Sequence, residues 1–388
     1  MTATLFDRHR VIDIDTHVTE PANLWVDRVS SKWGDQVPHV KRVEGVDRWF
    51  IGDQTAGIPG AYSNAGHDDY YPNFRKTFDD IPASMYDSTE RLKFMDQEKL
   101  YANIMYPNVG GFGAGSFLKI KDRKLTLECL QAYNDWLFEW CSVDSNRLIP
   151  VAAMPFWNLE QTVAEVKRVA EMGYRAILFC NQPQDHGMPT VRDKFWDPVW
   201  ATAQEAGLSV NFHIGGGDLS DLLNDTANIG LRANWARVST MAFIDNGKSI
   251  TDIICGGIPH RFPELKMVSV ESGAGWMPFL LESLDWQWHN SGVITEHAEY
   301  DLLPSEYFKR QMYASFWFEE RGLANAIEQY PDNILFETDY PHPTCQAPGP
   351  ASSGTRPELY AEKALAGISE DILGKVLHST AAELYGIV

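Results

Sequence analysis

The 388-residue sequence predicts a (β/α)8 barrel, and three observations support this prediction. Eight short stretches rich in apolar and β-branched residues occur along the chain, and most are separated by segments of helical period. Such alternation is typical of an α/β barrel, and a chain of this length can form one with insertions. The first stretch carries no GxGxxG motif, so a dinucleotide-binding fold has little support.

The eight stretches have the nearly continuous apolar character of parallel strands that are covered on both faces. In chain order they are "RVIDID" (10–15), "YANIMYP" (101–107), "RLIPVAAMP" (147–155), "YRAILFC" (174–180), "LSVNFHI" (208–214), "ELKMVSVE" (264–271), "QMYASFWF" (311–318) and "NILFETDYP" (333–341). We expect them to form one parallel sheet that closes into a barrel.

Two of the intervening segments carry clear helical signals. Residues 158–173 repeat apolar side chains at helical spacing and end in a glycine, which commonly terminates a helix. Residues 193–207 show the same pattern, with Asp193 as the expected N-cap. Both segments are expected to be helices that lead through a short turn into the next strand.

Two regions interrupt the simple alternation. Residues from about 23 to 82 contain a hairpin-like "VKRVEGVDRWFIGD" and an aromatic, glycine-rich stretch, and residues 215–260 hold a polar loop and then a helix. Insertions on this side of a barrel build lids and substrate pockets. We expect one domain over residues 1–388, in which the 23–82 insertion forms a lid or pocket wall. Its aromatic content indicates a small-molecule substrate with an apolar or aromatic acyl group.

Charge and composition narrow the partners and the compartment. The net charge of −20 disfavours nucleic acid and anionic membranes as partners. No apolar run approaches the roughly 20 residues of a membrane span, and the first residues lack the apolar core of a signal peptide, so a cytoplasmic protein is expected. The five cysteines are scattered without CxxC spacing, which argues against disulfides and a thiolate zinc site.

Residues of metal-binding type stand at the ends of four predicted strands, where barrel enzymes carry their chemistry. They are Asp15, His17, His213, Glu271 and Asp339. Each alone has an ordinary explanation, because a single acid there can cap a helix and a lone histidine is more often part of a core. Five such residues on four strands indicate a metal site with nitrogen and oxygen donors, which suits Zn, Fe or Mn.

Further residues near the strand ends have two interpretations each. Strand alternation sends Asp13 to the face of Asp15 and His17, as a hydrogen-bonded acid below the site. Glu20 is either a ligand or a turn residue. Three histidines on loops are expected to be solvated or to cap helices: His67, His186 and His260. Five aromatic residues follow strand ends and belong either to the core or to a pocket wall: Trp25, Tyr106, Phe112, Trp157 and Trp276.

These motifs resemble those of the amidohydrolase superfamily, in the branch that includes metal-dependent decarboxylases of carboxymuconate semialdehyde and resorcylate. The resemblance rests on "DIDTH", "NFHIG" and "ETDYPH", in that order, and extends from about residue 11 to residue 384. It implies a metal-dependent enzyme, often a homodimer, with the ligands Asp15, His17, His213 and Asp339. It also implies that His342 hydrogen-bonds either the substrate or a ligand carboxylate.

The sequence departs from this branch at the first, fourth and sixth strands. Asp15 stands where the branch has His or Glu, and Glu271 replaces a catalytic His of the decarboxylases. A carboxylate is a poor proton donor at neutral pH, which argues against decarboxylation. Glu271 is instead expected to help hold a second ion, with no lysine in the fourth strand to bridge the pair. This arrangement resembles the iron-pair hydrolases of coenzyme A thioesters in the same branch.

The sequence therefore predicts a metal-dependent hydrolase with one or two divalent ions, Fe or Zn in preference to Mn. A metal-activated water would attack an ester, thioester (such as an acyl-CoA), lactone or amide carbonyl. Asp339 is the expected base for that water, and Glu271 and His342 are the other expected catalytic residues. Two alternatives remain open. One is a metal-dependent, non-oxidative decarboxylase of an aromatic or unsaturated carboxylic acid, and the other is a non-catalytic barrel that binds a ligand.

Overall fold

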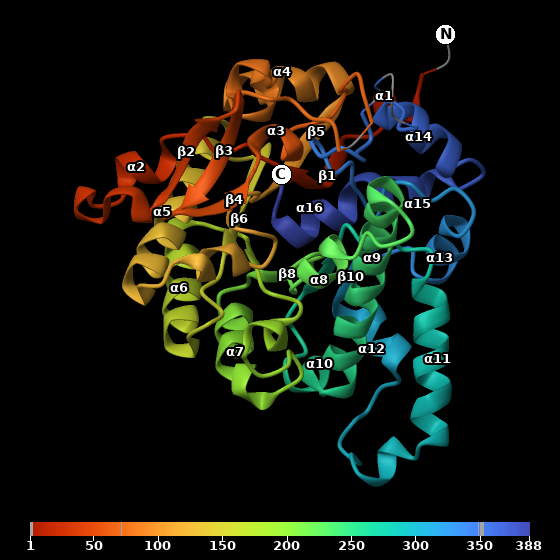
Figure 1. The fold of residues 1–388 in the computed structure, drawn as a ribbon. Coiled ribbons are helices and arrows are strands. Elements are labelled where there is room, and N and C mark those ends of the chain that lie inside the picture. Colours follow the sequence, from red (N-terminus) through yellow and green to blue (C-terminus); the bar gives the residue numbers. More distant parts are fainter. Residues whose placement is uncertain (1–2, 71, 348, 350–352) are drawn as a thin grey trace.

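Eight parallel strands form the predicted barrel in a computed structural model, which describes residues 3–70, 72–347, 349 and 353–388 (Figure 1). The strands follow one another around the barrel in chain order, from β1 through β5 to β11. The last strand returns to the first, because Thr16 forms a parallel bridge with Tyr340 and the His17 backbone N–H donates to the Tyr340 carbonyl at 2.7 Å. The predicted fold class is confirmed.

Each predicted apolar stretch overlaps one barrel strand. The strands are β1 (Val11–His17), β5 (Leu100–Tyr106), β6 (Leu148–Ala153), β7 (Ala176–Leu178), β8 (Ser209–His213), β9 (Met267–Val270), β10 (Met312–Phe316) and β11 (Ile334–Phe336). Nearly all of their residues are buried, as expected for strands with packed side chains on both faces.

Helices connect the strands and surround the barrel (Figure 1). They are α1 (Leu5–Arg8), α2 (Leu24–Arg28), α3 (Pro59–Tyr62), α4 (Ser88–Glu98), α5 (Arg123–Cys141), α6 (Leu159–Met172), α7 (Asp197–Glu205), α8 (Ser220–Asn224), α9 (Leu231–Cys255), α10 (Ile258–Arg261), α11 (Met277–Asn290), α12 (Pro304–Gln311), α13 (Leu323–Gln329), α14 (Pro357–Ala364), α15 (Glu370–Gly374) and α16 (Thr380–Tyr385).

The two segments with clear helical signals are helices, with one difference at a start. The Asn158 side chain caps α6, and Gly173 ends it at φ 102°, a backbone conformation that glycine adopts without a steric cost. Asp193 does cap a helical turn, but that turn spans only Lys194–Trp196, and α7 begins at Asp197. Pro198 explains the later start, because a residue without a backbone N–H is best tolerated in the first turn of a helix.

The barrel has an interior core and an outer core. Ile12, Ile14 and Leu335 belong to the cluster that fills the barrel, and Tyr385 of α16 joins them there. A second, larger cluster that includes Val11 lies between the strands and the surrounding helices. This division shows which face of each strand a side chain occupies.

Strand β1 contains a bulge that separates Asp13 from Asp15. Asp13 pairs with Asn103 and Thr16 pairs with Met105, so two residues of β1 lie opposite one residue of β5. Ile14 fills the barrel, and Asp13, one residue earlier, therefore faces outward. The prediction that strict alternation places Asp13 on the face of Asp15 and His17 is wrong, because the bulge shifts the phase of the strand after Ile14.

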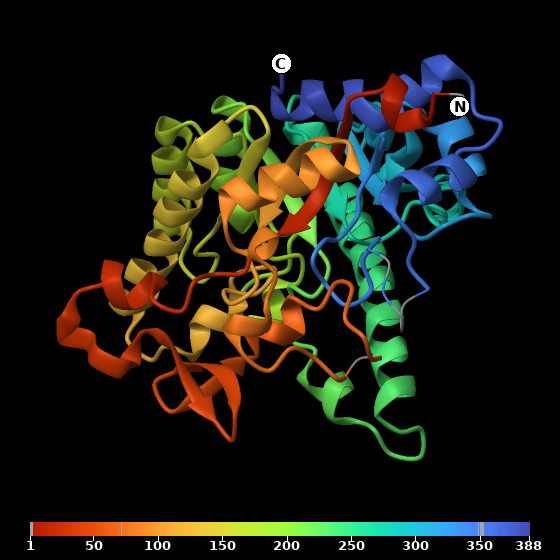
Figure 2. The same cartoon turned by 90° about the horizontal axis from the view of Figure 1, so that it is seen from above.

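The two insertions extend to the same side of the molecule (Figure 2). The predicted hairpin forms an antiparallel sheet of β2 (Pro38–Val43), β3 (Val46–Ile51) and β4 (Gln54–Gly57). The second insertion consists mainly of α8 and the long helix α9. Among the described residues, no helix is long and apolar enough to cross a membrane.

Candidate active site

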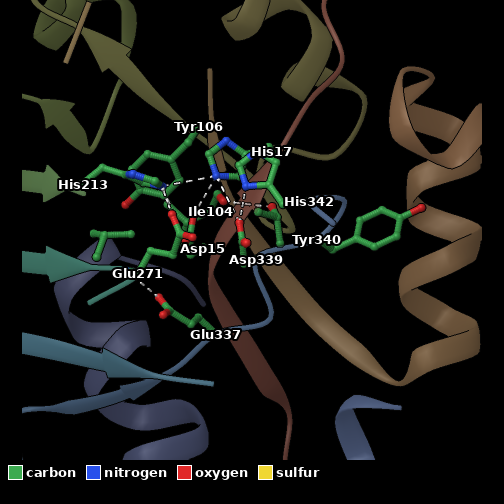
Figure 3. Close-up of polar contacts among 12 residues, drawn as sticks. Asp15, His17, Ile104, Tyr106, His213, Glu271, Glu337, Asp339, Tyr340 and His342 are labelled. Atoms are coloured by element: carbon green, nitrogen blue, oxygen red, sulfur yellow. Dashed lines mark hydrogen bonds and ion pairs between the residues drawn. The ribbon is translucent and has the colours of Figure 1, made fainter. Parts of the chain in front are cut away.

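The five strand-end residues of metal-binding type converge at the carboxyl end of the barrel (Figure 3). His17 Nε2 lies 3.4 Å from Asp15 Oδ1 and 3.5 Å from Asp339 Oδ1. His213 Nε2 lies 3.5 Å from Asp15 Oδ2, 3.4 Å from Glu271 Oε2 and 3.2 Å from His17 Nε2. All five side chains are buried. Residues as far apart in the sequence as Asp15 and Asp339 thus share one small volume.

Backbone carbonyls set the tautomers of the two histidines. His17 Nδ1 lies 3.0 Å from the carbonyl of Pro107, and His213 Nδ1 lies 2.8 Å from the carbonyl of Ile214. A carbonyl oxygen only accepts, so each Nδ1 carries the hydrogen and each neutral ring presents the lone pair of its Nε2. The two Nε2 atoms therefore face each other and the Asp15 carboxylate as acceptors, which is the arrangement of histidine ligands around a shared cation.

Two features of the cluster fit a bound divalent ion. Ligand atoms placed about 2.1 Å from one ion lie roughly 3.0–3.4 Å apart, close to the separations observed here. Both carboxylate oxygens of Asp15 are buried and accept no hydrogen bond from any residue that the structure describes. Buried carboxylates are costly without such a partner. The residues present thus fit a metal ion with nitrogen and oxygen ligands.

Two of the site carboxylates sit on unusual backbone conformations. Glu271 has φ 56° and Asp339 has φ 60°, in the left-handed region that residues other than glycine seldom adopt. Each of them follows the end of a barrel strand, where this conformation turns the chain away from the strand direction. The Asp339 backbone N–H donates to the Asp15 carbonyl at 3.0 Å, which ties the two strand ends together. Backbone strain of this kind concentrates at functional sites.

The acids of the cluster oppose one another's ionisation. Burial raises the pKa of Glu271 to about 8, and the neighbouring Asp15 adds to the shift. Burial, followed by the charges of Glu271 and Asp15, raises the pKa of Asp339 well above its usual value. Burial also opposes the ionisation of Asp15, but His213 and His17 hold its pKa below the usual range. A cation at this position would relieve the repulsion among these carboxylates.

Glu337 is a fourth acid at the site that the sequence analysis does not single out. It is fully buried below Glu271, and its Oε2 accepts the Glu271 backbone N–H at 3.2 Å (Figure 3). Burial, with the nearby Asp15 charge, raises its pKa well above the usual value. The available signal was strand alternation, because Glu337 follows the inward-facing Leu335 by two residues.

His342 joins the cluster through Asp339 and His17. Its Nδ1 lies 2.6 Å from Asp339 Oδ1, and its ring stacks on His17 with 3.9 Å between centroids. Its Nε2 lies 2.8 Å from Asn108 Oδ1. Because Asn108 Nδ2 donates to the Val18 carbonyl, Asn108 Oδ1 must act as the acceptor, and His342 Nε2 carries the hydrogen. The Nδ1 atom is thereby left to share a proton with Asp339.

Asp13 and Glu20 are structural rather than part of the cluster. Asp13 accepts from the backbone and the hydroxyl of Thr338, at 2.9 and 2.5 Å, which joins β1 to the segment after β11. Glu20 Oε1 accepts the backbone N–H groups of Asn108 and Val109, both at 2.9 Å. Glu20 thus fixes the distant loop after β5 instead of a turn of its own segment, and the same contact positions Asn108 for His342.

Arg91 is another contributor that the sequence analysis does not single out. Its buried guanidinium donates to the His17 carbonyl at 2.7 Å and to the Ser84 carbonyl at 2.6 Å. It also lies over the ring of Tyr340, next to Asp339. Arg91 and Asn108 carry no local sequence signal of this role, because both act on residues distant in the chain.

The loop histidines lie outside the cluster. His67 contacts the backbone of Asp69, His186 contacts the Gly216 carbonyl, and His260 lies near Asp301. Among the described residues, none of the three belongs to a group that could hold a metal ion. His67 lies on a loop as expected, whereas His260 lies in α10 and His186 contacts a distant carbonyl rather than capping a helix.

A cavity of about 260 Å³ opens beside the cluster. Glu271, Asp339 and His342 lie at one end of it, and Phe112 forms part of its wall. Of the five aromatic residues that follow strand ends, Phe112 is the one that lines this cavity. Trp25 is part of the core, whereas Tyr106 packs beneath the site at 5.4 Å from the His213 ring.

Several solved structures share the fold. They include an amidohydrolase from Mycobacterium avium subsp. paratuberculosis K-10, with 23% identity over 97% of this chain and 99% of that chain and a TM-score of 0.76. A 5-carboxyvanillate decarboxylase from Sphingomonas paucimobilis has 20% identity over 98% and 99%, with a TM-score of 0.65. A 5-carboxyvanillate decarboxylase from Novosphingobium aromaticivorans DSM 12444, complexed with manganese and 4-hydroxy-3-methoxy-5-nitrobenzoic acid, has 16% identity over 100% and 99%, with a TM-score of 0.66. No curated protein matches the sequence.

These comparisons correct the predicted activity. The two neighbours with a named reaction are decarboxylases, which contradicts the prediction of a hydrolase of esters, thioesters, lactones or amides and favours the decarboxylase alternative. The second ion at Glu271 stays a prediction. A divalent ion is supported by the ligand cluster and by the manganese of one neighbour, whereas the preference for Fe or Zn is not confirmed.

The sequence itself also identifies the family. A family model described as amidohydrolase matches residues 116–387, which is more than half of the chain. The resemblance seen in the strand-end motifs is confirmed, and it favours an enzyme over a non-catalytic barrel. The chain belongs to the amidohydrolase family.

Proposed function

We propose that this enzyme is a non-oxidative, metal-dependent decarboxylase of an aromatic or unsaturated carboxylic acid. The observation that carries the proposal is the position of three groups able to hold a proton, on Glu271, Asp339 and His342. They lie where the nitrogen and oxygen ligand cluster meets a largely apolar cavity. The reactions of the structural neighbours support the same class of chemistry.

Asp15, His17, His213 and Asp339 are the proposed metal ligands, with Glu271 as a further candidate. When bound, a divalent ion supplies the positive charge that attracts and orients the carboxylate of the substrate. Nitrogen and oxygen donors accommodate Zn, Fe and Mn alike. The manganese-bound neighbour makes Mn²⁺ the first ion to test.

The protein's own residues position the substrate and supply the proton. The apolar wall around Phe112 holds the ring or unsaturated chain and excludes water. The Asp339–His342 pair, in which Asp339 Oδ1 and His342 Nδ1 lie 2.6 Å apart, delivers the shared proton to the carbon that carries the carboxylate. The bond from that carbon to the carboxyl carbon then breaks, its electron pair stays with the substrate, and carbon dioxide leaves. A proton from water restores the donor pair.

Replacement of the catalytic His by Glu271 does not oppose this proposal. An ordinary carboxylate is ionised at neutral pH and is then a poor proton donor. Glu271 is not required as the proton donor, because the Asp339–His342 pair holds a shared proton at the same end of the cavity.

The test is carbon dioxide release by the Mn²⁺-loaded protein from a panel of hydroxybenzoic acids. In deuterium oxide the product should carry one deuterium at the carbon that loses the carboxylate. The matched control is Asp339→Asn, which keeps the size of the side chain and removes the exchangeable proton. Absence of carbon dioxide release across the panel from protein with bound manganese would contradict the proposal.

A further inference from the structure

One helix supplies a continuous stripe of side chains to the cavity wall. Trp235, Val238, Ser239 and Ala242 of α9 all line the cavity. The last three stand three, four and seven residues after Trp235, and this spacing places all four on one face of the helix. Apart from the Ser239 hydroxyl and the Trp235 indole nitrogen, this face offers the substrate apolar contacts.

The surrounding wall continues this apolar character. Leu219 and Leu223 extend the α9 stripe along the 215–230 segment, and Phe112 and Ile214 contribute from the loops that follow β5 and β8. The Phe112 ring stacks on His213 with 4.5 Å between centroids, so the apolar wall begins directly at the ligand cluster. A substrate held at the cluster therefore has its remaining atoms against mostly apolar groups, and the lining residues Tyr62 and Thr344 add hydroxyl groups but no charge.

The cavity offers no positive side chain away from the cluster. Among its sixteen described lining residues there is neither Lys nor Arg, and the charged groups present are the carboxyls of Glu271 and Asp339. The nearby arginines of α9 are directed elsewhere. Arg237 contacts Asn234 and Asp225, and Arg232 lies over the ring of Tyr70. A second carboxylate on the substrate would lose its hydration without gaining a partner.

We infer that the enzyme selects monocarboxylic acids whose remaining part is uncharged and apolar or aromatic, and that the α9 stripe is the element that imposes this selection. The inference rests on the proposed function, since it assigns the single carboxylate to the metal cluster. Beyond that function, substrates with a second carboxylate are expected to be excluded from the cavity. A positive charge at Ser239 would reverse that exclusion.

The first experiment measures binding of benzoate and isophthalate to the Mn²⁺-loaded protein by calorimetry. The two probes differ only in the second carboxylate of isophthalate. We expect isophthalate to bind at least about tenfold more weakly, because its second carboxylate enters the apolar wall unpaired. Equal or tighter binding of isophthalate would overturn the inference.

The second experiment places a cation on the stripe with Ser239→Arg. This variant should bind isophthalate more tightly than benzoate, because the guanidinium pairs with the second carboxylate. Ser239→Gln controls for added size, and Ile244→Arg adds the same charge at an exposed position of α9 outside the cavity lining. Both controls should keep the preference for benzoate. A well-folded, metal-loaded Ser239→Arg variant that still prefers benzoate would contradict the role of the stripe.

Activity measurements separate this inference from the proposed function. If monocarboxylic acids bind in preference but none releases carbon dioxide, the proposed function fails and the selectivity stands. If dicarboxylic acids are decarboxylated as fast as matched monocarboxylic acids, the proposed function stands and the selectivity fails.

Discussion

The ligand cluster and the α9 stripe meet in one cavity, but they are held in place very differently. Each cluster residue is buried and is fixed by further contacts, such as those of His17 with the Pro107 carbonyl and of His342 with Asn108. The stripe is one face of a single helix, whose outer side exposes Leu231 and Ile244 by about half. Removing one partner from a buried polar network costs much of its stabilising energy, whereas an apolar contact can be exchanged for another apolar side chain at a small cost.

This difference assigns the proposed chemistry to the ligand cluster and the proposed selectivity to the α9 stripe. The cluster is determined by directional contacts from four strand ends, so its geometry tolerates little change. The stripe acts through shape and the lack of charge, so it can change without moving the proposed ligands. Substitutions in the two regions should therefore have effects of different size and on different kinetic constants.

The largest effect is expected from removing a proposed ligand. His213→Ala should lower turnover by about 10³-fold or more and reduce the bound manganese per chain, because the charge that orients the substrate is lost. The helical circular dichroism signal should remain. His260→Ala, outside the cluster, is the control and should retain turnover. A His213→Ala protein that keeps its metal and most of its turnover would remove His213 from the ligand set.

Metal removal should destabilise the protein more at high pH than at low pH. In the metal-free folded protein, burial raises the pKa values of Glu271 and Asp339, whereas the unfolded chain ionises both groups from about pH 4.5. Their contribution to stability is therefore present below that pH and is lost as the pH rises toward the folded pKa, which is about 8 for Glu271. A bound cation favours the ionised carboxylates and offsets this loss.

The measurement is the Tm of manganese-loaded and chelator-treated protein at about pH 5 and about pH 8. The difference in Tm between the two forms should widen with pH, by an amount that corresponds to a few kcal/mol of unfolding free energy. Glu271→Gln should make the gap less dependent on pH. A gap that stays constant or narrows would show that these carboxylates do not face the ion.

An intermediate effect is expected at Asn108, which holds His342 without facing the metal ligands directly. Asn108→Ala should lower kcat by about 10- to 100-fold, because His342 is then free to turn its proton away from Asp339. KM and metal content should change little. The exposed Asn325→Ala is the matched control. A large loss of bound metal with unchanged kcat per metal would assign Asn108 a purely structural role.

The smallest effect is expected on the stripe. Val238→Ala should raise KM by several-fold for an apolar substrate, with kcat nearly unchanged, because it removes contact area but no catalytic group. Ile244→Ala on the exposed side of α9 should leave both constants unaltered. If Val238→Ala instead lowered kcat as strongly as Asn108→Ala, the distinction between cluster and stripe would not hold.

Much of the fold could be predicted because barrel strands are apolar on both faces. All eight stretches stood out by their side chains alone, and His213 and Asp339 were recognisable as polar groups at the ends of such runs. The activity could not be predicted in the same way. The activity depends on which side chains share a proton beside the cavity, such as Asp339 and His342, and a sequence motif does not record that contact.

Other parts of the site depend on contacts between distant segments. Asp13 and Asp15 look equivalent in "VIDIDTH", and only the pairing of β1 with β5 reveals the bulge that separates them. Asn108 and Arg91 have no local pattern that marks them, because their partners lie elsewhere in the chain.

The sequence by itself determined the barrel and the kinds of donor atom at its strand ends, since local periodicity and residue chemistry suffice for both. Only the tertiary structure decided which donors meet, which tautomers they adopt and which helix faces them. Those features follow from strand register, from the positive φ angles of Glu271 and Asp339, and from carbonyl groups brought close by folding.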